Sequence, residues 1–275
     1  MSSVPNLTLN NGVAIPQFGF GVFQVGPGET VAAVRQALEA GYRHIDTAQA
    51  YRNEGEVGRA IAESGLARDE VFVTTKLAND RQGRDSAVTA LGESLEKLGL
   101  DFVDLYLVHW PRPQADVYVQ TWEGMERCAK DGAARAIGVS NFQVPHLERL
   151  AAETATVPAV NQIELHPLLS QESLRAYHEA HGILTEAWAP IAKGGELLSD
   201  ERLLAIGQAH GKTAAQVVLR WHVQLGNVVF PKSVTPSRIR ENIDVFDFTL
   251  SGDEMAVVSG LDAGTRLGPD PDRFG

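Results

Sequence analysis

The sequence predicts an α/β protein in which eight parallel strands close into a (β/α)8 TIM barrel. Three observations point to it: short apolar runs alternate with helical stretches, most helical stretches stop at a glycine, and the chain has room for eight such units. Regular alternation is typical of parallel strands joined by crossover helices, and eight units in ~250 residues are typical of the closed barrel. No low-complexity or Ser/Pro-rich linker interrupts the chain, so residues 1–275 are predicted to form a single domain.

A short hairpin comes first, because residues 7–9 and 13–16 flank the turn at 10–12. It precedes the first barrel strand, and we therefore expect it to close the bottom of the barrel. The barrel strands are predicted at residues 18–21, 44–46, 71–75, 103–108, 134–139, 159–163, 183–187 and 228–230. The helices are predicted at residues 29–40, 55–64, 84–98, 116–130, 144–153, 171–181, 201–210, 213–225 and 236–245, followed by a polar tail. Glycines that end these helices, such as Gly41, Gly65 and Gly99, are typical of helix C-caps.

A doubly wound open sheet is the alternative fold. Such a sheet usually places a glycine-rich nucleotide-binding turn after its first strand, but residues 19–24 lack the third glycine of that motif. A second stretch, residues 207–213, is similar to a phosphate-binding P-loop. It has three residues between its glycines where the motif needs four, and it follows a helix. We interpret it as a turn between helices with Thr213 as the N-cap.

Composition narrows the class of function. The chain is 44% hydrophobic and 21% charged, and its formal net charge of −11 argues against nucleic acid or an anionic membrane surface as the main partner. Cys128 is the sole cysteine, so no intramolecular disulfide is possible. The N-terminus lacks the basic and apolar regions of a signal peptide, and no apolar run is long enough to span a membrane. We therefore expect a cytoplasmic protein.

Polar residues stand at the ends of the second, third and fourth predicted strands: Asp46, with Tyr51 five positions on, then Lys76, then His109. The loops after barrel strands share one face, so these side chains can converge there. Lys76 is expected to lower the pKa of Tyr51, and Asp46 to hold Lys76 charged. A neutral His109 would orient a substrate oxygen. Taken singly, each is equally well explained as a turn cap, a loop lysine or a wall residue, but together they predict a proton donor aimed at a carbonyl.

The later strands end in residues of a different kind, namely Ser140, Asn141, Gln162, Trp188, Lys232 and Ser233, and the predicted helix after the last strand carries Arg238, Glu241 and Asn242. The hydroxyl and amide groups both donate and accept hydrogen bonds, which suits a carboxamide ligand, and the indole offers a flat face for a planar ring. The basic residues after the last strand suit a phosphate monoester. An ordinary basic helix start is the alternative, but the net charge of −11 makes a basic cluster here more informative.

Several motifs also follow one another in order. They are Gly-Tyr-Arg-His-Ile-Asp-Thr-Ala at 41–48 with Tyr-Arg-Asn-Glu at 51–54, Thr-Thr-Lys-Leu at 74–77, Asp-Leu-Tyr-Leu-Val-His-Trp-Pro at 104–111, Ile-Gly-Val-Ser-Asn-Phe at 137–142, Val-Asn-Gln-Ile-Glu-Leu-His-Pro at 160–167 and Pro-Lys-Ser at 231–233. With these motifs the chain resembles the aldo-keto reductase family over nearly its whole length. Residues 144–149 and 241–248 resemble the bacterial 2,5-diketo-D-gluconate reductase branch.

The resemblance implies NADPH-dependent reduction of aldehydes, ketones and α-dicarbonyls by a monomer without a metal. It makes Tyr51 the proton donor, tuned by Lys76 and Asp46, with His109 orienting the carbonyl. The implied contacts to the cofactor, NADPH or NADP+, are Gly21, Val22, Phe23, Asp46, Ser140, Asn141, Gln162, Trp188, Ala189, Pro190, Ile191, Lys193, Gly194, Phe230, Pro231, Lys232, Ser233, Val234, Arg238, Glu241 and Asn242. The implied substrate contacts are Phe23, Tyr51, Ala78, His109 and Trp110.

Those cofactor contacts divide by role. By the resemblance, Trp188 would stack on the nicotinamide and residues 190–194 would cover the pyrophosphate. The carboxamide would be held by Ser140, Asn141 and Gln162. The 2′-phosphate would be bound by Lys232, Ser233 and Arg238, and the adenine would be contacted by Glu241 and Asn242. Ala78 departs from the family, which commonly has Trp there, so a wider substrate pocket is expected. Lys193 stands where the branch often has an uncharged residue, which predicts an added phosphate contact, and the short tail after Leu261 predicts a pocket without a long lid.

Three other functions compete with this interpretation. A lyase on the same barrel would form a Schiff base through Lys76 or Lys232. A metal-dependent hydrolase is indicated only by His44 and Asp46, because later strand ends lack further ligands. A non-catalytic NADPH-binding regulatory subunit is the third, and the intact set of four polar residues argues against it.

Overall fold

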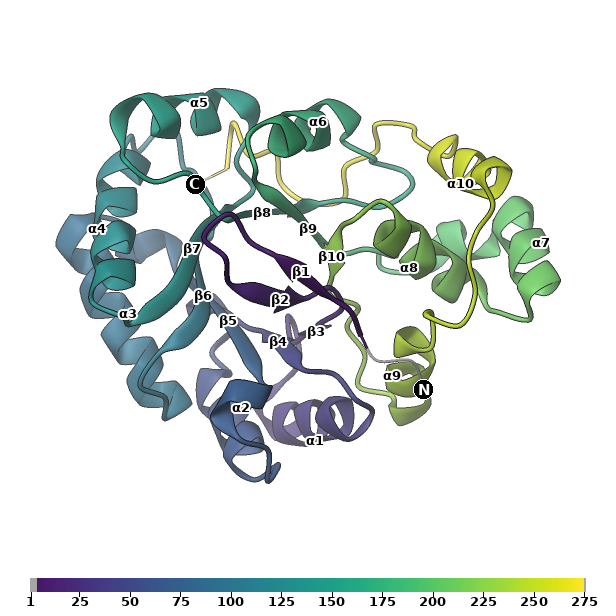
Figure 1. Ribbon diagram of the computed structural model, residues 1–275, viewed down its shortest axis with the longest axis horizontal. Helices are drawn as coiled ribbons and strands as arrows, with labels where there is room; N and C mark the ends of the chain where they lie inside the picture. The colour runs from purple at the N-terminus through teal and green to yellow at the C-terminus, as the bar shows by residue number, and fades with distance from the viewer. Residues whose placement is uncertain (1–3, 275) are drawn as a thin grey trace.

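The computed structural model describes residues 4–274 and contains the predicted ring of eight parallel strands (Figure 1). The strands pair in chain order and are β3 (Phe20–Gly21), β4 (His44–Asp46), β5 (Phe72–Leu77), β6 (Val103–Val108), β7 (Ala134–Ser140), β8 (Val160–Glu164), β9 (Leu184–Trp188) and β10 (Val228–Val229). A parallel bridge between Phe18 and Val229 closes the ring, and Gly19 N donates to Val229 O at 2.9 Å. The fold is therefore the closed barrel and not the doubly wound sheet.

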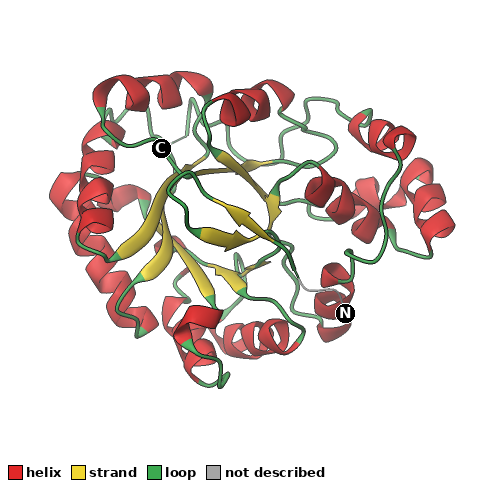
Figure 2. Ribbon diagram, viewed as in Figure 1, coloured by secondary structure: helices red, strands yellow, loops and turns green. Residues whose placement is uncertain are grey.

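Helices surround the ring on its outer side, as Figure 2 shows by the red ribbons around the yellow strands. They are α1 (Pro27–Glu39), α2 (Glu54–Ala62), α3 (Arg84–Leu98), α4 (Tyr118–Lys130), α5 (Val144–Glu153), α6 (Glu172–Ala180), α7 (Glu201–His210), α8 (Ala214–Gln224), α9 (Pro236–Ile243) and α10 (Gly252–Ser259). Thr213 caps α8 as predicted, since its side chain accepts a hydrogen bond from Gln216 N. In the described part of the chain, no helix is both long and apolar enough to cross a membrane.

The prediction of a polar tail after the last helix is wrong over residues 252–259, which form α10. Ser251 Oγ accepts from Glu254 N at 3.2 Å, and the Glu254 carboxylate accepts from Ser251 N at 2.7 Å. This reciprocal pair is a capping box, whose Ser-x-x-Glu signature is present in the sequence. Val258 and Leu261 then pack into the main hydrophobic core.

The N-terminal hairpin lies across the bottom of the ring, as predicted (Figure 1). Its strands are β1 (Asn6–Thr8) and β2 (Ala14–Pro16). Leu9 and Ile15 are buried in one cluster with barrel-strand residues such as Phe72. Because the hairpin fills this end of the barrel, the functional site is left with the opposite end, where the strands have their carboxyl termini.

The barrel strands are buried on both faces. Every residue of β5 and β6 is buried, as expected of parallel strands covered by helices outside and by side chains inside. β5 also runs two residues beyond the predicted 71–75, so Lys76 lies within the strand and has no exposed surface. Polar side chains in such an interior need partners on neighbouring strands.

Candidate active site

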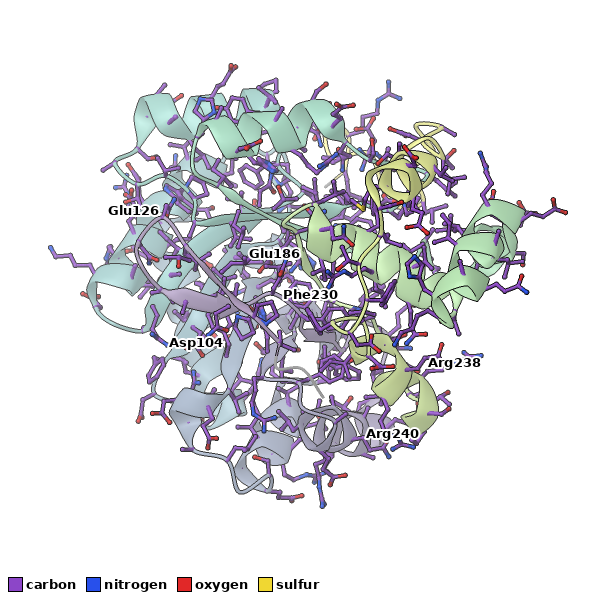
Figure 3. All side chains as sticks on the ribbon, turned by 45° about the vertical axis from the view of Figure 1, so that its right-hand side comes forward. Asp104, Glu126, Glu186, Phe230, Arg238 and Arg240 are labelled. Carbon is purple, nitrogen blue, oxygen red and sulfur yellow. The ribbon has the colours of Figure 1, made fainter. Side chains whose placement is uncertain are left out.

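The carboxyl ends of the strands open into a cavity of about 1220 Å³. The predicted site residues that line it are Gly21, Phe23, Asp46, Tyr51, His109, Trp110, Ser140, Asn141, Gln162, Trp188, Ala189, Pro190, Ile191, Lys193, Gly194, Phe230, Pro231, Lys232, Ser233, Arg238, Glu241 and Asn242. Figure 3 labels two groups around this region: Glu186 and Phe230 in the interior of the ring, and Arg238 and Arg240 on α9. One cavity thus gathers residues that lie far apart in the sequence.

The four polar residues predicted at the strand ends come together. Lys76 Nζ donates to Asp46 Oδ1 at 2.6 Å and to Thr47 O at 2.9 Å. It also lies 3.5 Å from the Tyr51 hydroxyl, which is its weakest contact. The His109 ring packs edge-on against Tyr51, with ring centroids 5.8 Å apart. Tyr51 itself stands in a single 3-10 turn after β4, so its hydroxyl faces the cavity while Lys76 lies behind it.

Burial and neighbouring charges have opposite effects on the pKa values of Lys76 and Tyr51. Burial disfavours the ammonium of Lys76, but the charges and hydrogen bonds of its neighbours, Asp46 first and then Tyr51, together outweigh it, so the pKa of Lys76 is raised and the group stays charged. Burial likewise raises the pKa of Tyr51, and the charge of Lys76 offsets only part of this. The expectation that the pKa of Tyr51 would be lowered is therefore wrong for the net effect. Lys76 acts in the expected direction, but the loss of water around the phenol is larger.

His109 is neutral, as the sequence argument required. Burial, together with the charge of Lys76, lowers the pKa of His109 to about 3. Its ring is partly accessible from the cavity, and its backbone carbonyl accepts from Asn141 Nδ2 at 3.0 Å. A neutral imidazole at this position can donate one hydrogen bond without adding a charge.

The amide side chains are already bonded to one another and to their surroundings. Asn141 Nδ2 donates to His109 O and to Ser140 Oγ, both at 3.0 Å, while Asn141 Oδ1 accepts from Trp188 Nε1 at 2.8 Å. Gln162 Nε2 donates to two carboxyl groups, Asp46 Oδ2 and Glu186 Oε2, each at 2.9 Å. Both amides have therefore used their N–H groups, and what they can offer to a ligand is acceptor capacity.

The predicted basic cluster stands at the mouth of the cavity. Lys232 and Arg238 are exposed, and across residues 4–274 neither has a carboxylate within 4.0 Å. Lys212, which also lines the cavity, differs because Asp244 and Asp247 each lie 2.8 Å from its ammonium group. Two cations without protein counter-ions at a cavity mouth suit a phosphate ligand.

The loop after β9 has an unusual backbone. Ala192, Lys193, Gly194 and Gly195 follow one another with φ of 50°, 60°, 84° and 59°, in the left-handed region. Successive left-handed residues turn the backbone sharply, and two of these four carry side chains that disfavour this conformation. At the start of the loop, Pro190 O accepts from the buried His222 at 3.0 Å. Lys193 is exposed at the cavity wall.

Three predicted contact residues do not line the cavity. Val22 is fully buried, because its backbone continues β3 and its side chain packs in the core. Val234 is 40% exposed on the outer surface. Ala78 is not among the residues that line the cavity, and its N–H donates to Gln49 Oε1 at 3.1 Å; the wider substrate pocket expected from an alanine at this position stays a prediction.

The C-terminal segment supplies wall residues that the sequence argument missed. Leu267, Gly268, Pro269 and Phe274 line the cavity, and the Phe274 ring lies 4.5 Å from that of Trp110 between centroids. The buried Glu164 carboxylate anchors the segment, because it accepts from Leu267 N at 2.6 Å and from Gly268 N at 3.0 Å. Further lining residues outside the prediction are Gln24, Ala50, Gly195, Leu198, Leu204, Lys212, Thr213, Ala214 and Ala215. No local sequence signal marks these contacts.

Together, the barrel and a large cavity at the carboxyl ends of its strands, with the buried Tyr51–Lys76–Asp46 cluster at its wall, are typical of a (β/α)8 enzyme. A family model described as "Aldo/keto reductase family" matches residues 17–263. An aldo-keto reductase of Mycolicibacterium smegmatis is 54% identical over 98% of each chain. Methylglyoxal reductase DkgA of Escherichia coli is 50% identical over the full length of both chains.

Solved structures agree with these sequence relatives. The crystal structure of an aldo/keto reductase from Brucella melitensis has a TM-score of 0.91 and 51% identity, covering 94% of this chain and 100% of that one. A Bombyx mori aldo-keto reductase in complex with NADP has a TM-score of 0.92 and 38% identity, covering 99% and 97%. The chain belongs to the aldo/keto reductase family, and it is an NADP-dependent oxidoreductase, as the sequence predicted.

Proposed function

We propose that this protein reduces small α-dicarbonyls and aldehydes with NADPH and that Tyr51 is the proton donor. The observation that carries the assignment of Tyr51 is its hydroxyl at the cavity wall, 3.5 Å from an ammonium group whose charge Asp46 maintains at 2.6 Å. The bound cofactor supplies the hydride. The protein's own task is to hold the carbonyl and to deliver a proton to its oxygen.

The four polar residues divide this task between them. The neutral His109 donates to the carbonyl oxygen and fixes its direction. Tyr51 keeps its proton in the resting protein because burial raises the pKa of its phenol. When negative charge develops on the substrate oxygen, Tyr51 donates its proton, and the charge on Lys76 stabilises the phenolate that remains. Asp46 keeps Lys76 charged and in place.

The cavity fits the proposed cofactor. Asn141 and Gln162 offer acceptors, which match the N–H groups of a carboxamide, and Trp188 offers a flat indole beside them. Lys232 and Arg238 have the charge and the freedom from carboxylates that a 2′-phosphate requires, with Ser233 between them. We assign Gly21, the loop at 189–194 and residues 230–231 to the same cofactor, because they line the cavity between these two ends.

The substrate end of the cavity is partly aromatic. Phe23, Trp110 and Phe274 surround the region of Tyr51, and the Phe23 ring lies 5.1 Å from the Tyr51 ring between centroids. We assign the substrate site to these residues together with His109. The DkgA relatives are methylglyoxal reductases, which favours a compact dicarbonyl, and the aromatic walls favour acceptance of larger aldehydes as well.

We further propose that the protein acts as a single-domain monomer in the cytoplasm, on small molecules and not on nucleic acid. The net charge of −11 supports the absence of a nucleic-acid partner. A single cysteine supports a reducing compartment. Size-exclusion chromatography with light scattering measures the oligomeric state directly.

The test is NADPH oxidation by the purified protein with methylglyoxal and with an aromatic aldehyde, for the parent chain and for Tyr51→Phe. We expect Tyr51→Phe to lower kcat at least about a thousandfold, because the lost hydroxyl donates its proton in the transition state and is not needed for binding. Its affinity for NADPH, measured by fluorescence titration, should stay close to that of the parent. Near-normal turnover by the variant would exclude Tyr51 as the donor.

The competing functions have separate outcomes in the same experiment. A Schiff-base lyase would be trapped covalently by borohydride with a carbonyl substrate and without NADPH. The raised pKa of Lys76 argues against it, because a charged ammonium is not a nucleophile. A regulatory subunit would bind NADPH without oxidising it with any carbonyl in the panel.

A further inference from the structure

Glu186 is a buried carboxyl group inside the barrel that none of the roles above uses. It lies on β9, two residues before Trp188, and it has no exposed surface. Figure 3 labels it in the interior of the ring. Carboxyl groups are seldom buried without partners, so its contacts indicate what it does.

One contact joins Glu186 to the site. Gln162 Nε2 donates to Glu186 Oε2 and to Asp46 Oδ2, each at 2.9 Å, so two carboxyl groups from β9 and β4 hold one amide on β8. An amide is planar, so its carbonyl oxygen lies on the side away from the two acceptors of its N–H groups. Gln162 lines the cavity, and that oxygen is the atom it can offer there.

The protonation state of Glu186 decides whether a second negative charge lies beside Asp46. Burial, and next the charge of Asp46, raise the pKa of Glu186 to about 8, while Gln162 and Lys76 act in the opposite direction. This direction favours the neutral acid near pH 7, in which Glu186 provides an acceptor without placing a second negative charge beside Asp46. Within residues 4–274 its other oxygen, Oε1, is buried without a hydrogen-bond partner. A residue whose only role was to fill the core would not need a carboxyl group.

We propose that Glu186 is a positioning residue, which with Asp46 turns the Gln162 amide so that its carbonyl oxygen alone faces the cavity and accepts from the N–H groups of the nicotinamide carboxamide. The inference rests on the proposed function, in which Gln162 binds that carboxamide. Glu186 acts through Gln162 and orients the nicotinamide ring. The charged phosphate contacts at the cavity mouth dominate cofactor affinity, so orientation is affected more than binding.

The experiment compares NADPH with its reduced 3-acetylpyridine analogue, whose acetyl group has no N–H to donate. Glu186→Met removes the acceptor at nearly constant length. We expect it to lower kcat with NADPH about tenfold, the effect of one lost orienting hydrogen bond, and to change kcat with the analogue less than about twofold. The Kd for NADPH should change less than about threefold. Glu186→Gln, whose amide oxygen still accepts from Gln162, should recover most of the rate with NADPH.

Two further variants separate positioning from a general effect on the fold. If Glu186 acts through Gln162, the double variant E186M/Q162M should be no slower than Q162M alone. Thr185→Val is the matched control, because Thr185 lies next to Glu186 on β9 but contacts His178 at 2.9 Å, outside the barrel. It should lower Tm without changing the ratio of rates with the two cofactors.

Each contrary result has a defined meaning. Equal losses with both cofactors, additive losses in the double variant, or full activity of E186M while Q162M is impaired would overturn the role of Glu186 and leave the proposed function standing. An unimpaired Q162M would overturn both this role and the carboxamide assignment. Circular dichroism and Tm are measured first, and E186L is prepared in parallel so that a folded apolar replacement is available.

Discussion

Lys76 carries a charge with no exposed surface, and the structure shows how that charge is kept. Asp46 lies 2.6 Å from the ammonium group and Thr47 O lies 2.9 Å from it, so two of its three N–H groups have close acceptors. Removing one member of a buried ion pair typically costs about 3–5 kcal/mol, because the other charge is left uncompensated. The pair therefore provides a fixed positive charge behind Tyr51, as the proposed proton transfer from Tyr51 requires.

The raised pKa of Glu186 predicts that the stability of the folded protein depends on pH between about 4.5 and 8. Its pKa is about 8 in the folded protein and 4.5 in an unperturbed chain. Between these values the folded state holds a proton that the unfolded chain has released, so the stability contributed by this group is complete below about pH 4.5 and is lost as pH rises toward 8. Glu186→Gln has no proton to lose.

We therefore expect the unfolding free energy of Glu186→Gln, relative to the parent, to rise with pH by up to about 1.4 kcal/mol per pH unit between pH 5 and pH 8. Urea unfolding at several pH values in this window measures it. A constant difference between the two proteins would mean that Glu186 does not titrate in this range.

At the scale of single elements, α9 offers a matched pair of arginines for testing cofactor choice. Arg238 lines the cavity and Arg240, two residues on, does not, although both are exposed (Figure 3). We expect Arg238→Ala to weaken NADPH binding about tenfold or more, the value of a charge-assisted hydrogen bond, and to leave NADH binding unchanged. Arg240→Ala should affect neither cofactor. Fluorescence titration gives all four constants, and equal effects of the two substitutions would remove Arg238 from the 2′-phosphate site.

The C-terminal segment forms a wall of the cavity through a close backbone approach at Gly268. A Cβ added there would lie 2.4 Å from Trp188 Cη2 and 3.0 Å from Glu164 Oε2. Gly268→Ala must therefore displace either the segment or the indole, at a typical cost of about 1–3 kcal/mol.

We expect Gly268→Ala to raise KM for NADPH, because Trp188 is assigned to the cofactor site, and for the carbonyl substrate, because Phe274 of the same segment packs on Trp110 at the substrate site. The tryptophan emission spectrum should change as well. Gly252→Ala is the control, since a Cβ there meets nothing within 4 Å and α10 tolerates alanine. Steady-state kinetics distinguishes the two variants. Unchanged KM values in Gly268→Ala would show that the segment moves aside without altering the site.

For the whole molecule, four histidines predict sensitivity to acid. Burial lowers the pKa of His44, His109, His178 and His222 to about 3, from 6.5 in an unperturbed chain. The unfolded chain takes up these protons between pH 6.5 and 3 while the folded protein excludes them, so stability falls as pH is lowered through this window. Glu186 acts in the opposite direction, because above about pH 4.5 the folded protein holds a proton on this group that the unfolded chain has released.

The unfolding free energy should therefore fall by about 4 kcal/mol per pH unit near pH 5, corresponding to a net uptake of about three protons. Urea unfolding at closely spaced pH values gives the slope. His178 does not line the cavity. His178→Asn should reduce the slope by the equivalent of about one proton, whatever its effect on absolute stability. An unchanged slope in this variant would mean that His178 is not neutral in the folded protein.

Much of the fold is visible in the sequence because its signals are local. Apolar runs, helix-ending glycines and the Asn10–Gly12 turn predict the hairpin, the eight strands and nine of the helices to within a few residues. The tenth helix, α10, also has a local signal, the Ser251–Glu254 capping box, although the predicted polar tail does not include it. The residue types of the active site are also local signals, because they stand at strand ends and within contiguous motifs.

The barrel, the family and the polar residues at the strand ends can thus be predicted from the sequence alone. How those residues are paired and ionised depends on contacts that exist only in the folded barrel. Gln162 bonds to Asp46 across 116 positions, and Glu164 anchors Leu267 across 103, and neither pairing leaves a local pattern. The pKa of Tyr51 rises instead of falling because it depends on how much water the closed barrel excludes. A side chain on one strand becomes buried and finds its hydrogen-bond partners only when the neighbouring strands are in place, so both properties depend on the closed ring.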